Sequence, residues 1–75
     1  MGIKIIGMRE MNVIFGVTDR LDISREAIVV PLGPASPGRV RRLPNGKFEI
    51  TVDADQPIEV WAETLEKELI RLLDG

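Results

Sequence analysis

The sequence predicts an α+β fold, in which a small, mainly antiparallel sheet of four to five strands packs against one C-terminal amphipathic helix. Two observations predict this fold. Two strand-like runs surround a turn signal at residues 44–46, and apolar residues with helical spacing follow from residue 58 onward. The chain has 75 residues, of which 44% are hydrophobic and 29% are charged, so we expect a single small domain over residues 1–75.

Residues 11–18 predict a strand, because they are rich in β-branched and aromatic side chains and show no helical spacing of apolar residues. We expect this strand to pair with residues 3–8, which form another short apolar run. Gly16 would weaken the strand or mark a bulge in it.

The next segment combines turn signals with one more apolar run. Asp22 or Ser24 is suited to cap a short helical turn. Residues 27–30 predict a strand that ends at Pro31. Residues 33–38 predict a loop, because two prolines and two glycines prevent regular structure there.

The clearest structural signal is a β-hairpin formed by residues 40–43 and 47–53. Asn45 and Gly46 both tolerate the positive φ angles that the tight primed turn of a hairpin requires. Apolar and polar residues alternate strictly along the second run, so one face of that strand should be buried and the other solvated.

A helix over residues 58–73 is predicted by apolar positions that recur every three or four residues. Asp55 or Gln56 is the expected cap, and Pro57 suits the first turn, where its missing N–H costs nothing. The stripe that this helix should bury consists of Ile58, Trp61, Leu65, Leu69 and Leu72.

The chain contains no histidine and no cysteine. It therefore has neither the disulfides nor the ordinary structural zinc site that stabilise many small domains. Association with a second copy is the remaining remedy, so we expect a homodimer. The short apolar run at residues 3–6 lacks a cleavage site for secretion, which predicts a cytoplasmic protein.

Residues 42–73 combine the second hairpin strand with a helix that reads Thr-Leu-Glu-Lys-Glu-Leu-Ile-Arg-Leu-Leu from residue 64. This block resembles the short prokaryotic zinc metallopeptidases of the ImmA/IrrE type, which place an edge strand before a helix carrying Thr-Leu-x-His-Glu-Leu-x-His-x-Leu. The matching residues are Thr64, Leu65, Glu68, Leu69 and Leu72. The two histidine ligand positions of that family fall on Lys67 and Arg71.

The resemblance implies a zincin-like domain with a degenerate metal site at Lys67, Glu68 and Arg71. The two cationic side chains would repel a divalent cation, so Glu68 would have no polarised water to act on. We therefore expect no enzyme activity, no metal and no cofactor. A generic amphipathic helix, with Glu63–Lys67 and Glu68–Arg71 as solvated ion pairs, explains the same residues without any peptidase ancestor.

The first functional hypothesis is a pseudoenzyme that acts as a protein-interaction or regulatory module and associates with itself. Its partner would be another protein or a second copy of the chain, and we expect neither a membrane nor a small-molecule substrate. The interface residues we expect are Val60, Trp61 and Ile70, since Val60 and Ile70 fall outside the buried stripe. Scattered apolar surface is common, however, so ordinary packing is the competing explanation.

The alternative hypothesis is a nucleic-acid-binding module that uses the basic hairpin. Its candidate residues are Arg39, Arg41, Arg42 and Lys47. Clustered lysines and arginines are what phosphate contacts require. The net charge of −2 and the low aromatic content of 4% argue against this partner.

Overall fold

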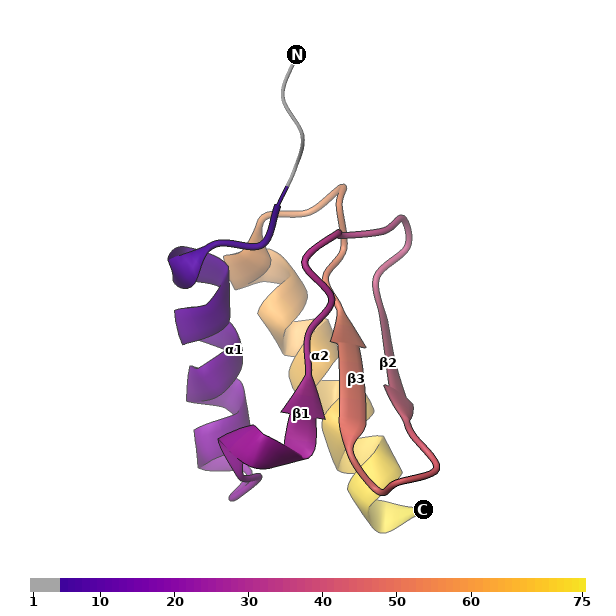
Figure 1. Ribbon diagram of the computed structural model, residues 1–75. Helices are drawn as coiled ribbons and strands as arrows, with labels where there is room; N and C mark the ends of the chain where they lie inside the picture. Colours follow the sequence, from indigo (N-terminus) through magenta and orange to yellow (C-terminus); the bar gives the residue numbers. More distant parts are fainter. Residues whose placement is uncertain (1–4) are drawn as a thin grey trace.

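Two parallel helices and a three-stranded sheet form the protein, shown in Figure 1 as a computed structural model that describes residues 5–75. The elements in chain order are α1 (Met8–Arg20), the 3-10 helix η1 (Arg25–Ala27), β1 (Ile28–Val29), β2 (Arg39–Arg42), β3 (Phe48–Thr51) and α2 (Ile58–Asp74). Helix α2 lies along one face of the sheet, and α1 packs beside α2. Both helices begin at the same end of the molecule.

The amino-terminal helix α1 corrects the predicted strand over residues 11–18. Ile14, Val17 and Thr18 are buried on one side of α1, with Met11 and Leu21 partly buried one turn before and after them. This spacing of three or four residues is helical, and packing against α2 overrides the β propensity of the side chains. The expected pairing with residues 3–8 is wrong for residues 5–8, and residues 1–4 lie outside the described part.

The start of α1 is held by one hydrogen bond between its cap residue and a side chain of the first turn. The Glu10 side chain accepts a hydrogen bond of 2.9 Å from the amide of Gly7, which precedes the first turn. This bond satisfies an amide that has no partner within the helix, and it places a negative charge at the positive end of the helix dipole. The bond therefore favours the helix over an extended chain at this point.

The sheet is mixed and has three strands in the order β1-β3-β2 among the described residues. Strand β3 lies in the centre, parallel to β1 and antiparallel to β2. The prediction of a mainly antiparallel sheet with four to five strands and a single helix is therefore wrong.

The strand predicted over residues 27–30 exists in shorter form as β1. Ser24 caps η1, the short helix before this strand, by accepting a hydrogen bond from the amide of Glu26.

The predicted hairpin is confirmed as β2 and β3, but its turn differs from the expected one. Only Gly46 has a positive φ, of 87°, and Asn45 does not. The Gly46 amide donates to the Leu43 carbonyl at 2.9 Å, and the Leu43 amide donates to the Lys47 carbonyl at 2.7 Å. One left-handed residue after an ordinary turn is enough to close a three-residue loop, so the primed two-residue turn is not needed.

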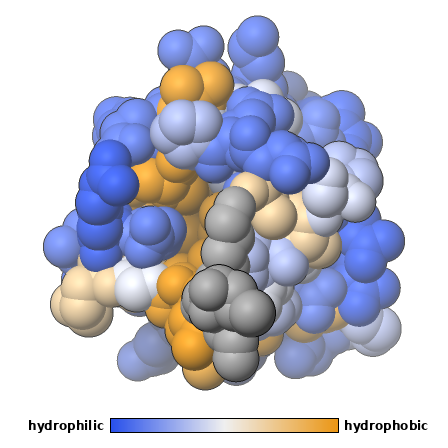
Figure 2. Space-filling view, turned by 90° about the horizontal axis from the view of Figure 1, so that it is seen from above, coloured by the Kyte–Doolittle hydropathy of each residue, from blue (hydrophilic) through white to orange (hydrophobic). Residues whose placement is uncertain are grey.

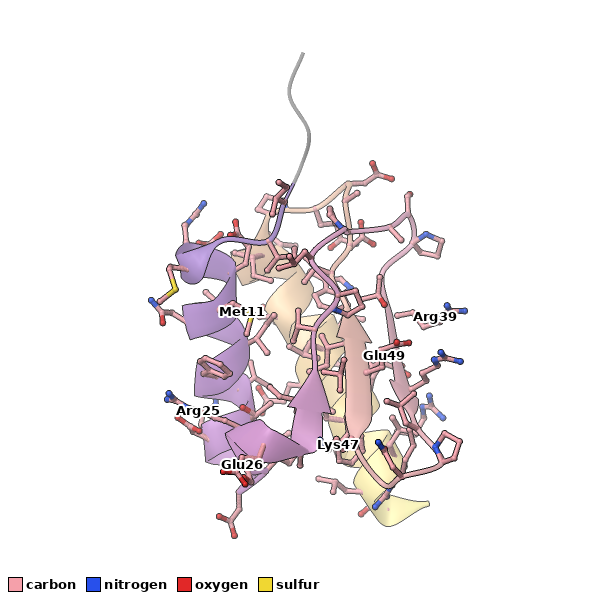
Figure 3. All side chains as sticks on the ribbon, viewed as in Figure 1. Met11, Arg25, Glu26, Arg39, Lys47 and Glu49 are labelled. Atoms are coloured by element: carbon pink, nitrogen blue, oxygen red, sulfur yellow. The ribbon has the colours of Figure 1, made fainter. Side chains whose placement is uncertain are left out.

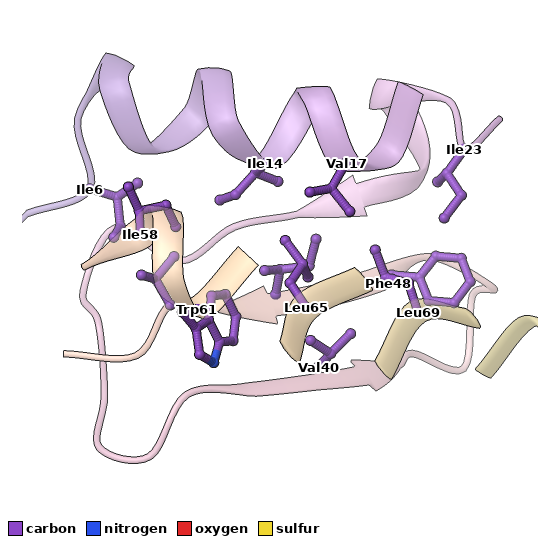
Figure 4. Close-up of a cluster of buried hydrophobic side chains, with 12 residues drawn as sticks. Ile6, Ile14, Val17, Ile23, Val40, Phe48, Ile58, Trp61, Leu65 and Leu69 are labelled. Atoms are coloured by element: carbon purple, nitrogen blue, oxygen red, sulfur yellow. The ribbon is translucent and has the colours of Figure 1, made fainter. Parts of the chain in front are cut away.

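Helix α2 confirms the predicted carboxyl-terminal helix, although its cap is different. Pro57 takes the cap position with no side-chain hydrogen bond, and the Asp55 carboxylate instead accepts a bond from the Ser36 hydroxyl. Four residues of the predicted stripe are buried, whereas Leu72 is only partly buried. Figure 4 shows these side chains between α1 and the sheet. The core consists of Ile6, Ile14, Val17, Ile23, Val40, Phe48, Ile50, Val52, Ile58, Trp61, Leu65 and Leu69.

Neither helix in residues 5–75 is long and apolar enough to cross a membrane.

Candidate functional site

A groove of about 390 Å³ runs between strand β2 and helix α2. One wall is formed by residues 38–40, at the start of β2, and the other by four side chains of α2. These four are Trp61, Thr64, Glu68 and Arg71. Their spacing of three and four residues places them on one line along α2, next to the face that packs on the sheet.

The floor of this groove is rigid because its apolar residues belong to the core. Trp61 is only 2% exposed and Val40 is 6% exposed, and both pack in the hydrophobic cluster. Figure 4 shows both side chains within the buried cluster. The rim, by contrast, carries Arg39, Glu68 and Arg71, so an apolar floor lies between charged edges.

Of the three degenerate metal-site positions, the structure brings Glu68 and Arg71 into the groove, while Lys67 is exposed outside its lining. Arg71 donates from Nη2 to the Glu68 Oε1 at 2.6 Å, and its Nε donates to the same oxygen at 3.2 Å. The acidic side chain is thus neutralised by its neighbour. Within residues 5–75, no group of three or more Asp, Glu, His or Cys side chains is arranged to hold a metal ion.

The three residues expected at an interface do not form one surface. Trp61 is buried in the core, so its expected place at an interface is not supported, while Val60 and Ile70 are 57% and 41% exposed. Ten helical residues separate Val60 from Ile70, which places them about 15 Å apart along α2 and about 80° apart around it. They are therefore two isolated apolar positions and not a continuous patch.

The four basic residues of the hairpin are likewise divided. Arg39 and Arg41 alternate with the buried Val40, so both side chains leave β2 on the face of the sheet opposite α2. Arg39 also borders the groove, because it lies at the end of the strand. Arg41 donates from Nε to the Glu49 Oε1 at 2.6 Å, across the strand pair. Arg42 lies over the Phe48 ring, with its guanidinium carbon 4.9 Å from the ring centroid. Lys47 is exposed in the turn.

Two residues to which the sequence assigns no role in a groove, Gly38 and Asp53, hold the groove in shape. Gly38 donates its amide hydrogen to the Asp53 carboxylate at 3.1 Å, and Asp53 also accepts a bond of 2.7 Å from the amide of Asp55. These bonds hold the pKa of Asp53 below the ordinary value of a carboxyl group, and the bond from Gly38 has the larger effect. Burial of the carboxylate acts in the opposite direction and raises the pKa. The only sequence signals were a glycine directly before β2 and an aspartate shortly after β3.

A second hollow, of about 250 Å³, lies at the end of the molecule where both helices begin. Its lining includes Ile6, Pro34 and Ile58 together with the charged Arg9 and Glu10. Figure 2 views this end and shows hydrophobic residues between hydrophilic ones. Arg9 forms an ion pair with Glu59, which joins the first turns of the two helices. Arg9 therefore has a partner within the fold.

No protein-family model matches the chain, and neither the curated proteins nor the solved structures give a significant match. The resemblance of residues 42–73 to the ImmA/IrrE-type peptidases therefore stays a prediction that rests on the sequence motif.

Proposed function

We propose that this protein is a non-catalytic, zincin-like interaction module, which binds an extended peptide segment of a partner protein in the groove between β2 and α2. The observation that carries this proposal is the position of β2, which lies at an edge of the sheet and beside the groove. An edge strand presents backbone groups to which another extended chain can bind. We take the module to act in the cytoplasm.

The hydrogen-bond pattern of the hairpin indicates which backbone groups of β2 are free to bind. Leu43 donates to Lys47, so these two form a hydrogen-bonded pair. Hydrogen-bonded and non-hydrogen-bonded pairs alternate along antiparallel strands, which makes Arg41 and Glu49 the next hydrogen-bonded pair. The backbone N–H and C=O of Arg42, by the same alternation, point away from β3 and toward the open edge.

The non-catalytic part of the proposal follows from the residues at the former ligand positions. A catalytic zinc needs several deprotonated protein ligands, whereas Lys67 and Arg71 are cationic. Arg71 instead binds Glu68, which is the residue that would act as general base in a zinc peptidase. The degenerate site is therefore compatible with a groove that binds a chain without cleaving it.

A proline variant tests strand addition directly. Arg42→Pro removes the outward N–H of β2, and an edge strand tolerates proline where that N–H is not bonded to a neighbouring strand. Arg42→Ala removes the same side chain but keeps the N–H, so it is the matched control. We expect a neutral peptide of alternating threonine and valine to bind Arg42→Ala and to lose binding to Arg42→Pro, as measured by NMR titration. Equal binding to both folded variants would contradict strand addition.

Self-association is a separate part of the proposal, and it would use exposed apolar residues such as Val60 and Ile70 on α2. Because these two residues are isolated from each other, we expect any dimer to be weak. Sedimentation of the unmodified chain and of Ile70→Glu tests this part. If both the unmodified chain and Ile70→Glu sediment as strict monomers, the proposal of self-association is wrong. The proposal of a peptide-binding groove is not affected by that result.

The nucleic-acid alternative receives less support from the geometry. Phosphate binding needs cations gathered on one surface, whereas the basic residues of the hairpin are divided between the two faces of the sheet and the turn. Arg41 is also neutralised by Glu49. If the protein binds nucleic acid, its affinity should fall steeply between low and physiological salt. An affinity that does not change with salt would exclude nucleic-acid binding.

A further inference from the structure

We infer that the segment which binds beside β2 is acidic, and that it is not a second copy of this chain; the inference rests on the function proposed above. Three of the four residues of β2 are arginines. The chain as a whole has a net charge of −2, so this edge differs in sign from the rest of the molecule. An interface with one dominant sign selects partners of the opposite sign.

Strand β2 keeps a positive charge after the internal ion pairs are taken into account. Arg41 is paired with Glu49, and Arg71 is paired with Glu68. Arg39 and Arg42 have no ion pair with any residue in the described range 5–75. Two uncompensated positive charges therefore lie on the strand that the ligand would contact.

Arg39 is placed to contact such a ligand. It lies at the start of β2 and lines the groove. Figure 3 shows its side chain extending from β2 outward beyond the sheet. A strand that pairs with β2 would run alongside this guanidinium group, and its carboxylates could accept charge-assisted hydrogen bonds from it.

The same arginines argue against edge-to-edge association of two copies. If two β2 strands paired in antiparallel fashion with full overlap, Arg39 would face Arg42. A shift by one residue would instead place Arg41 opposite Arg41 or opposite Arg39. Like charges directly opposite each other destabilise a strand pair. Charge on an edge strand is also a common means by which proteins prevent such pairing. The free edge is thus closed to a second copy and open to an acidic chain.

The experiment compares three synthetic peptides of equal length, in which valine alternates with glutamate, with threonine or with lysine. Binding is followed by NMR titration at low and at physiological salt. We expect the glutamate peptide to bind about tenfold more tightly than the threonine peptide at low salt, with a smaller ratio at higher salt, and the lysine peptide to bind most weakly.

Two charge reversals localise the effect. Arg39→Glu should remove or reverse the preference for the glutamate peptide. Lys67→Glu changes the net charge by the same amount at an exposed position outside the groove lining, and it should keep most of the preference.

Failure of the inference and failure of the proposed function give different results. Equal affinity for the glutamate and threonine peptides, or tightest binding of the lysine peptide, overturns the acidic preference while leaving the peptide groove in place. Binding of none of the three peptides overturns both. A dimer whose interface maps to the amide signals of β2 overturns the exclusion of a second copy.

Discussion

Gly38 and Asp53 are joined so closely that no side chain fits between them. The Gly38 amide donates to the Asp53 carboxylate at 3.1 Å, and a Cβ atom on Gly38 would lie 2.6 Å from the backbone nitrogen of Asp53. The neighbouring Ala35 also bridges to Asp53 in parallel fashion. This contact fixes the loop before β2 against the end of β3, and so it fixes one wall of the groove.

Gly38→Ala should therefore destabilise the protein. Because the new methyl group would meet backbone atoms and not a flexible side chain, we expect a loss of about 1–3 kcal/mol in the free energy of unfolding. Gly33→Ala is the matched control, since nothing lies within 4 Å of its added Cβ. Urea denaturation of both variants measures the difference. Equal stability of the two variants would contradict the close contact.

Asp53 should make stability depend on pH in the acid range. Its folded pKa is lowered by the amides of Gly38 and Asp55, so the unfolded state takes up a proton first as pH falls. The stabilisation is full above the unfolded pKa of about 3.9 and is lost as pH falls through the lower folded pKa. Asp53→Asn should flatten this acid slope in urea titrations, whereas the exposed Asp74→Asn should not. An unchanged slope in Asp53→Asn argues against the two amide bonds.

Gly16→Ala tests whether residues 11–18 are helical. Gly16 lies inside α1, and an added Cβ would meet only the Arg20 side chain at 4.0 Å. Alanine has the higher helix propensity and restricts the unfolded chain, so we expect a gain of about 0.4–1 kcal/mol in the free energy of unfolding. Thermal and urea denaturation measure it. A strand at this position would instead gain little from alanine, which is depleted in strands.

Zinc should leave the protein unchanged. The positions that correspond to the histidine ligands carry Lys67 and Arg71, and the chain has no histidine or cysteine elsewhere. We expect no change in melting temperature when Zn²⁺ is added in moderate excess, because a ligand stabilises a protein only by binding its folded state. A concentration-dependent rise in melting temperature that a chelator reverses would contradict the non-catalytic reading of the groove.

The sequence was sufficient where its signals were local. The hairpin and α2 follow from alternation, from the turn at residues 44–46 and from a helical stripe, and the structure contains both. The error at residues 11–18 arose because Val13, Ile14, Phe15 and Val17 favour strands when they are judged by residue type. The burial of Ile14 and Val17 depends on packing against α2, which lies about fifty residues further along the chain and which local patterns do not report.

The groove was less accessible to sequence interpretation than the helix beside it. The peptidase-like motif places Lys67, Glu68 and Arg71 at one site. In the structure, Glu68 and Arg71 line the groove, whereas Lys67 does not. Strand β2 lies at an edge of the sheet because β3 lies between β1 and β2 and pairs with β1 in parallel. Such a parallel pairing joins distant segments and has no local turn signal. The charge of Arg39 is evident from the sequence, whereas its place at the rim of the groove depends on the fold.

Hydrogen exchange at β2 tests the central claim most directly. The Arg42 amide points to the open edge, whereas the Arg41 amide is bonded within the sheet by the alternation that starts at Leu43. On addition of the alternating glutamate and valine peptide, we predict that exchange of the Arg42 amide slows markedly while that of Arg41 changes little. Saturating peptide that leaves the Arg42 amide unprotected, or that protects only amides of α1, would contradict an acidic strand bound at this edge.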